Sequence, residues 1–255
     1  MKRILVPIDF SESARNALQY AHQLSANLGM PLSLLNCYPA QVYSRRYHFG
    51  KKEYSMGIRE MLVDFYKKNV EEQLKKTLFL AKPGSVVDTV ASISKDYQLV
   101  VLSGNTYGSK LKRWMGSRTS YITAMAQCPV LTVPPSRHFE PWEKVWQIKR
   151  KHSEKTIPVK LLTRLKIEPS AVAIKCLEQT AFTSALWEAI VAYEHAPRRA
   201  LKKEIMQVHE QEGLDLIMLA GSDRSSFQKF ITDDAKHLFF QFNLPVLVFP
   251  VGMIK

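Results

Sequence analysis

The sequence lacks any long apolar run and contains few cysteines. No stretch of its 255 residues approaches the roughly 20 consecutive apolar residues that a bilayer-spanning helix needs. The apolar run at the start is interrupted at Pro7 and Asp9, too early for the core of a signal peptide. Cys37, Cys128 and Cys176 are odd in number and widely spaced, which disfavours a disulfide framework. We therefore expect a cytoplasmic protein without a membrane partner, whose cysteines are thiols of the core.

Acidic residues are scarce relative to basic ones. The chain has 23 Asp and Glu against 36 Lys and Arg, a formal net charge of +13. Such a surplus can indicate nucleic-acid binding, but the basic residues are scattered. Zinc-ligand spacings, aromatic RNA-binding signatures and basic heptads are also absent from the sequence. We therefore expect no specific nucleic-acid partner, and any residual binding should weaken steeply with salt.

Motifs for catalysis are also missing. The sequence contains neither a G-x4-G-K-S/T loop nor an S-G-G-x-D loop, and no Ser, Cys or His has a recognisable nucleophile setting. The seven histidines occur singly, without the spacing of metal ligands. We therefore predict no catalytic residue and no metal site.

What the sequence does contain is an alternation of apolar strands and amphipathic helices. The predicted strands of the first half are Arg3–Ile8, Leu32–Tyr38, Thr77–Ala81, Leu99–Leu102 and Pro129–Pro134. The predicted helices run from Ala14 to Leu28, Met56–Lys76, Val86–Ile93 and Thr119–Met125. This order favours an α/β fold with a parallel sheet covered on both faces.

Two apolar segments recur later in the chain. Leu99–Gly104 is echoed by Leu216–Gly221, and Cys128–Pro134 by Leu244–Pro250, at offsets of 117 and 116 residues. The repeat predicts tandem domains, 1–136 and 142–255, joined by a proline-bearing stretch. Further elements predicted in the second half are strands 144–149, 171–177 and 189–193 and helices 157–165 and 200–211.

The loop that follows Leu99–Leu102 is the main candidate site. It is rich in Gly, Lys and Arg, and loops at the carboxyl ends of parallel strands are where ligands bind. Gly116 and Ser117, just before a helix, would present backbone N–H groups suited to phosphate. Simpler alternatives stay open at this level: Asp9 also suits a cap of the first helix, and the basic loop residues suit a solvated surface.

Four segments together resemble a universal stress protein domain, and the whole chain resembles a tandem of two. They are Ile4–Ser11, Leu99–Gly104, the Gly116-Ser117 pair and Cys128–Val133. The resemblance implies two five-stranded parallel-sheet domains and a site for ATP or another adenine nucleotide in the first. The resemblance implies that Pro7 and Ile8 line the base pocket and that Asp9 contacts the adenine or ribose. It also implies that Gly104, Gly108, Gly116 and Ser117 surround the phosphates, and Ser103 and Arg118 complete the expected cofactor-binding residues.

The sequence departs from the family pattern in both halves. The first-half loop reads G-x3-G-x7-G-S, one residue shorter between its outer glycines than the family's G-x2-G-x9-G-S/T, and Tyr107 stands where that pattern has its second glycine. In the second half Arg150 falls near the place of the first-strand acid, and Asp223 follows the single glycine of the loop. We therefore expect the second domain to be degenerate, keeping the fold without the nucleotide.

The resulting expectation is a stress-response protein that acts by binding, with an adenine nucleotide as its ligand. A slow ATP hydrolase and a protein-interaction scaffold with empty pockets are the alternatives. We also expect Pro129–Pro134 and Leu244–Val251 to lie side by side, which would make the chain an intramolecular pseudo-dimer, with a homodimer as the further option.

Overall fold

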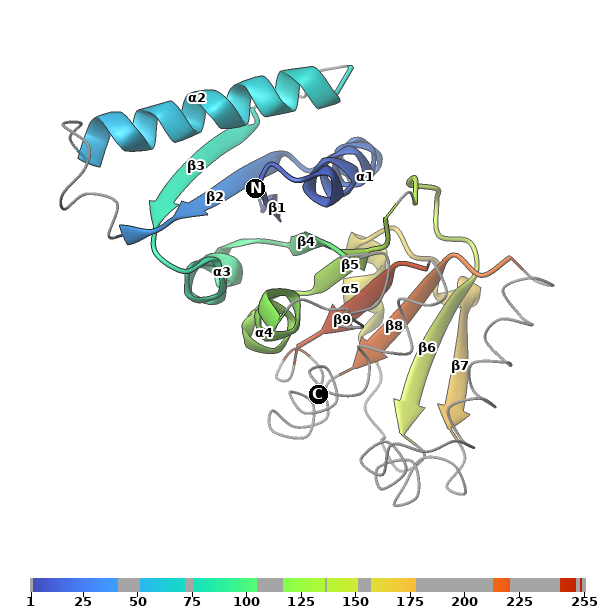
Figure 1. Cartoon of the computed structure of the whole chain (residues 1–255). Coiled ribbons are helices and arrows are strands. Elements are labelled where there is room, and N and C mark those ends of the chain that lie inside the picture. The colour runs from blue at the N-terminus through green and yellow to red at the C-terminus, as the bar shows by residue number, and fades with distance from the viewer. Residues whose placement is uncertain are drawn as a thin grey trace, which may run out of the picture. The chain divides into compact units, whose positions relative to one another are not determined.

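The chain divides into two units, Met1–Phe139 and Glu140–Lys255, in the computed structural model (Figure 1). The structure describes residues 2–40, 51–71, 76–104, 117–135, 137–150, 157–177, 213–220, 244–250 and 253. Each unit is built on a parallel sheet.

The first unit holds a five-stranded parallel sheet in the order β3-β2-β1-β4-β5. The strands are β1 (Ile4–Pro7), β2 (Leu32–Tyr38), β3 (Leu78–Pro83), β4 (Leu99–Ser103) and β5 (Val130–Val133). The residues of β1, β2, β4 and β5 are mostly apolar and almost all of them are buried. Because β1 pairs with β2 on one side and β4 on the other, the strand order reverses at β1, and such a switch point is where ligands bind in open α/β sheets.

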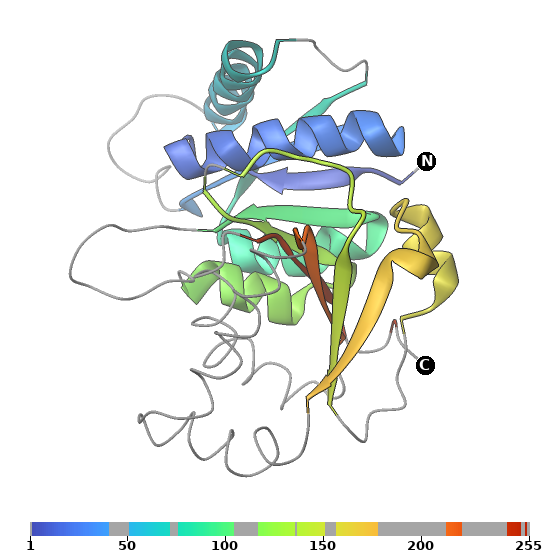
Figure 2. The same ribbon diagram turned by 90° about the vertical axis from the view of Figure 1, so that its right-hand side faces the viewer.

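Helices cover both faces of this sheet (Figure 2). They are α1 (Glu12–Leu28), α2 (Lys51–Asn69), α3 (Val86–Ile93) and α4 (Ser117–Met125), with a 3-10 turn at Ser94–Asp96. α1 packs against α2, and α3 packs against α4 on the opposite face. Within the described part of the chain, no helix combines the length and the apolar character needed to span a membrane.

Local sequence sets the ends of α1, but not the end of α2. Ser11 caps α1 through its Oγ, which accepts from the Ala14 N–H at 3.2 Å, and Gly29 ends the helix at φ +66°. The prediction that the second helix runs to Lys76 is wrong, because α2 ends at Asn69. There the Asn69 side chain donates to the Phe65 carbonyl at 2.7 Å, and Gln19 of α1 donates to the Asn69 carbonyl at 3.2 Å. The last carbonyl is thus satisfied by another helix.

The described strands of the second unit are arranged in the order β9-β8-β6-β7, all parallel. They are β6 (Val145–Arg150), β7 (Val172–Leu177), β8 (Leu216–Ala220) and β9 (Val246–Phe249), with helix α5 (Val159–Arg164) and a 3-10 turn at Pro169–Ala171. The predicted strand 189–193 and helix 200–211 lie outside the described residues.

The register makes β6 the counterpart of β1. Val145 pairs with Val172 and Leu216, just as Ile4 pairs with Leu32 and Leu99. Arg150 lies as many residues after Val145 as Asp9 lies after Ile4, so Arg150 corresponds in register to Asp9. Arg150, the last residue of β6, therefore corresponds to a residue of opposite charge, Asp9, which lies two residues beyond the end of β1.

The cysteines differ in their environments. Cys128 is 1% exposed in the core between the sheet, α3 and α4, so the expectation of a core thiol is correct there. Cys37 is half-buried: it packs against the same core and also lines a pocket, so the expectation of a core thiol holds only in part for it. Burial raises the pKa of Cys37, and it raises the pKa of Cys128 to about 12.

The Cys128 thiol makes stability depend on pH in alkaline solution. Its pKa rises from 9.0 to about 12 on folding, so between these values the unfolded chain has lost the proton and the folded chain has kept it. The free energy of unfolding should therefore fall above pH 9, with a contribution of up to about 1.4 kcal/mol per pH unit. Urea unfolding at pH 7, 9 and 10 measures this effect. In Cys128→Ala the fall should be shallower, and an identical pH dependence in both proteins would contradict the assignment.

Candidate functional site

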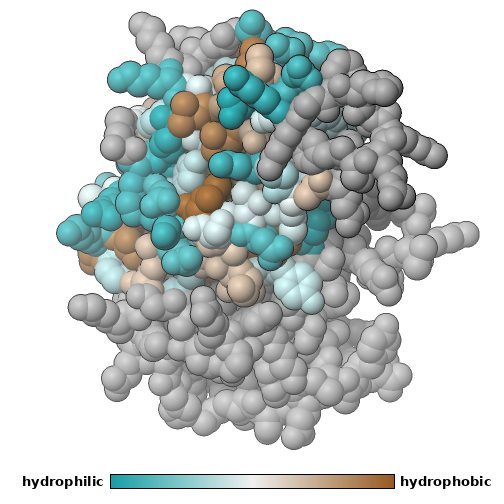
Figure 3. All heavy atoms as spheres, turned by 90° about the vertical axis from the view of Figure 1, so that its left-hand side faces the viewer, coloured by the Kyte–Doolittle hydropathy of each residue, from teal (hydrophilic) through white to brown (hydrophobic). Residues whose placement is uncertain are grey.

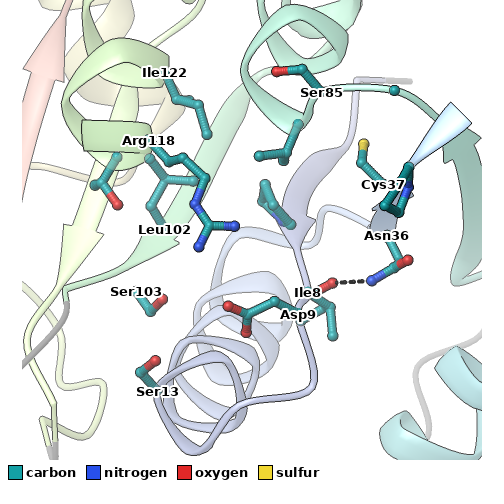
Figure 4. Close-up of a pocket in the computed structure, with 15 residues that line it drawn as sticks. Ile8, Asp9, Ser13, Asn36, Cys37, Ser85, Leu102, Ser103, Arg118 and Ile122 are labelled. Atoms are coloured by element: carbon teal, nitrogen blue, oxygen red, sulfur yellow. Dashed lines mark hydrogen bonds between the residues drawn. The ribbon is translucent and has the colours of Figure 1, made fainter. Parts of the chain in front are cut away.

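A cavity of about 320 Å³ opens at the carboxyl ends of β1, β2 and β4 (Figure 4). This is the switch point of the sheet, and the volume lies within the usual range of small-molecule sites. Figure 3 shows the side toward which β2 and β3 point, where hydrophilic and hydrophobic residues are mixed. The lining of the cavity has the same mixed character.

Asp9 lies two residues after the end of β1 and lines the cavity. Its Oδ1 accepts from the Ser11 N–H at 3.1 Å and from the Ser11 hydroxyl at 2.5 Å. The helix cap is therefore Ser11, and Asp9 holds Ser11 in place. Between them Phe10 adopts φ +62°, an uncommon conformation for a side chain of this size, and its ring packs edge-on against Phe65 with centroids 5.5 Å apart.

Arg118 lies on the other side of the cavity, in the first turn of α4. Figure 4 shows its guanidinium turned toward the side of the cavity where Asp9 lies. Asp9 and Arg118, which both belong to the described part of the chain, do not form an ion pair with each other. A carboxylate and a guanidinium thus face the same space, where a ligand can contact both.

The ends of β2 and β3 supply another wall of the cavity. Asn36 and Cys37 come from β2, and the Asn36 side chain donates to the Ile8 carbonyl at 2.7 Å. Gly84, at φ +106°, turns the chain from β3 into α3, and its N–H bonds to the Tyr38 carbonyl at 2.7 Å. Ser85 then caps α3, with its Oγ 3.4 Å from the Asp88 nitrogen. The amino-terminal turns of α3 and α4 therefore both contribute to the lining.

The structure brings together five of the residues predicted for the site. Those that line the cavity are Pro7, Ile8, Asp9, Ser103 and Arg118. Gly104 lies next to Ser103 but outside the lining, and its N–H bonds to the Val133 carbonyl at 2.7 Å. Ser117 begins α4, and Gly108 and Gly116 lie outside the described residues.

Sequence reasoning did not select much of the lining. The additional residues include Ser13 of α1, Asn36 and Cys37 of β2, 84–86 at the start of α3, and Thr119 of α4. Part of this lining could have been predicted from the sequence. The carboxyl end of the predicted strand Leu32–Tyr38 and the Pro83-Gly84 turn lie at the same edge of a parallel sheet as the end of the first strand. Over the residues that the structure describes, no cluster of three or more His, Cys, Asp or Glu could hold a metal ion.

The five-stranded parallel sheet, its two helical layers and the pocket at the switch point define a doubly wound α/β protein. The family model described as Universal stress protein family matches residues 1–134, so the chain belongs to the universal stress protein family. The predicted family and the predicted α/β fold class are both confirmed.

Two solved structures match over nearly the whole chain. A universal stress protein from Archaeoglobus fulgidus DSM 4304 is 13% identical with a TM-score of 0.55, and the match covers 97% of this chain and 96% of that one. A protein of unknown function from Pseudomonas aeruginosa PAO1 is 15% identical with a TM-score of 0.53, over 98% of this chain and 92% of that one. At such identities these matches show a shared fold. A search of curated proteins found no match.

Proposed function

We propose that the first unit binds ATP or another adenine nucleotide in the cavity at the switch point, and that the protein acts in a cytoplasmic stress response through this binding. The observation that carries the proposal is the placement of Asp9 and Arg118 around one cavity of about 320 Å³. A nucleotide offers donors on its base and ribose to a carboxylate, and negative phosphates to a guanidinium.

The residues around Asp9 and Arg118 indicate how the nucleotide would be oriented in the cavity. Ser103 and Thr119 lie on the Arg118 side, where the first turn of α4 adds backbone N–H groups and the positive end of a helix dipole. Ile8 lines the cavity beside Asn36 of β2, whose side chain donates to the Ile8 carbonyl, and Val86 adds a further apolar side chain to the lining. The phosphates would therefore lie toward α4 and the base toward β2.

In the second unit we propose that nucleotide binding is lost. Arg150 occupies the register position of Asp9, so the carboxylate that would accept from base or ribose is replaced by a cation. The second unit would then keep the family fold without binding a nucleotide.

Calorimetric titration with ATP tests the proposal. Wild-type protein should bind, and Asp9→Ala should weaken binding about 5- to 150-fold, because one polar contact is worth about 1–3 kcal/mol. Asp9→Asn keeps an oxygen for Ser11, and therefore separates the loss of charge from any disturbance at the start of α1. Asp223→Ala, in the second unit, serves as the control and should change nothing.

Two results would count against this site. Absence of binding heat with wild-type protein would favour a scaffold with an empty pocket. Binding that survives Asp9→Ala combined with Gly116→Val would place the nucleotide elsewhere.

A further inference from the structure

We propose that the segment leading from the first unit into the second is held on α1 as a strap, and that a nucleotide bound in the cavity strengthens this docking. The strap consists of residues 134, 135 and 137–139, the last described residues of the first unit. The inference rests on the proposed function of the cavity and adds a regulation of that site: its occupancy is transmitted to the chain that enters the second unit.

Three side chains of α1 hold the strap, which runs along this helix (Figure 2). Asn16 donates from Nδ2 to the Pro134 carbonyl at 2.8 Å. About two turns further along, Gln23 accepts at Oε1 from the Phe139 N–H at 3.2 Å. Between them the Tyr20 ring packs edge-on against the Phe139 ring, with centroids 5.4 Å apart. Spacings of four and three residues place the three side chains on one face of the helix.

The strap lies outside the sheet. Pro134 and Pro135 carry no backbone N–H, so the hydrogen-bond ladder of β5 cannot continue through them, and β5 ends at Val133. The strap is instead held through side chains of α1, and its bond at Phe139 is exposed to solvent. A segment held in this way opens without unfolding of the strands beneath it, which gives the strap a docked and a released state.

The first residue of the strap lies where two walls of the cavity are joined. Ser13 lines the cavity from the first turn of α1, and Asn16, which holds the Pro134 carbonyl, follows one turn later. Ser103 lines the cavity from the end of β4, and the residue after it donates its N–H to the Val133 carbonyl at 2.7 Å. The bond from Asn16 to Pro134 therefore ties the α1 wall of the cavity to the wall formed by β4 and β5.

A nucleotide that contacts both walls binds more tightly when the tie between them is made. A ligand shifts a two-state equilibrium by as much as its affinities for the two states differ. With the strap docked, α1 is held at the end of β5 and the walls are in place around the cavity of about 320 Å³. With the strap released, the ligand must also order these walls. Because coupling between two sites is reciprocal, ATP strengthens docking by the factor by which docking strengthens ATP binding.

Hydrogen exchange of a single amide measures the docking, because the Phe139 N–H bonds to a side chain of α1. In wild-type protein, saturating ATP should slow the exchange of this amide, followed by NMR, by about 5- to 150-fold, the usual range of coupling between two sites. In Asn16→Ala the tie to Pro134 is removed, so the effect of ATP on this exchange should disappear. Calorimetry should show a loss of ATP affinity in the same variant, up to the factor found for exchange.

Two further variants separate the coupling from a general effect on α1. Gln19→Ala is the matched control, because Gln19 of α1 also bonds to a backbone carbonyl, that of Asn69, but in α2 rather than in the strap. This variant should keep the wild-type response of the Phe139 amide and the wild-type affinity for ATP. Phe139 does not line the cavity, so Phe139→Ala should weaken ATP binding through release of the strap. If Asn16 served only the stability of α1, Phe139→Ala would bind ATP like wild-type protein.

The outcomes distinguish this inference from the proposed function. If ATP binds wild-type protein without changing the exchange of the Phe139 amide, or if Asn16→Ala behaves like Gln19→Ala, the coupling is wrong while the nucleotide site stands. A Phe139 amide that exchanges at the rate of an unfolded chain, with and without ATP, would show that the strap is not docked. If ATP does not bind wild-type protein, the proposed function fails and the coupling fails with it.

Discussion

Replacement of Arg118 by glutamate is expected to lower the affinity for ATP by at least about 100-fold, while the affinity for adenosine stays within about 3-fold of wild type. A hydrogen bond to a charged group is worth about 1.5–3 kcal/mol, and the new carboxylate adds repulsion of the phosphates to this loss. Adenosine has no phosphate, so it should not depend on the sign of the charge at the first turn of α4. Calorimetry with both ligands measures the two changes in the same protein.

The matched control is Arg59→Glu. Arg59 is an exposed residue of α2, and it does not line the cavity. The substitution changes the net charge by the same amount as Arg118→Glu, so it reports the effect of overall charge alone. Equal losses in the two variants would show that Arg118 acts only through the net charge of the chain. A wild-type affinity that weakens with added salt more than that of Arg118→Glu would support a direct contact with phosphate.

Arg3→Leu is expected to reduce the free energy of unfolding by about 3–5 kcal/mol. The Arg3 guanidinium joins three neighbouring segments of the first unit. Its Nε donates to the Ser33 hydroxyl at 2.8 Å, and its other donors reach the carbonyls of Leu32 and Lys76. Ser33 is fully buried, so a leucine at position 3 would leave its oxygen without this donor as well as freeing two carbonyls.

Urea unfolding measures the decrease in the free energy of unfolding for Arg3→Leu, and Arg15→Leu is the matched control. Arg15 makes an ion pair with Glu12 at 2.8 Å, in which the Arg15 side chain is about half exposed and the Glu12 side chain is largely exposed, so its removal should cost less than about 1 kcal/mol. The same arginine-to-leucine change is thus made in a partly buried network that joins three segments and in a single ion pair at the surface. If Arg3→Leu lowered the free energy of unfolding by less than about 1 kcal/mol, the hydrogen bonds of Arg3 would contribute no more than an exposed ion pair, and the prediction would be wrong.

The sequence by itself determined the order of elements and much of one wall of the pocket. Apolar runs such as Leu99–Leu102 form strands because they bury completely, and Ser11 and Gly29 set the ends of α1 through local hydrogen bonding and a left-handed turn. Asp9 was identifiable because it directly follows the first strand, and residues at the carboxyl ends of parallel strands meet at one edge. The helix ends depend on residues close in the sequence, and the place of Asp9 follows from the parallel order of the strands.

Only the tertiary structure decided the features that join distant segments. The Asn36 side chain bonds to Ile8 across 28 residues of sequence, and the Gln19 side chain of α1 bonds to the last carbonyl of α2, that of Asn69, across 50. The placement of Arg118 opposite Asp9 likewise depends on how α4 packs beside β4 and β1. Periodicity and propensity report which face of an element is buried, but the partner of a polar side chain is fixed by packing between elements. This is the physical reason why the sequence predicted the edge of the sheet that holds the pocket, while the other polar side chains of its lining emerged only from the fold.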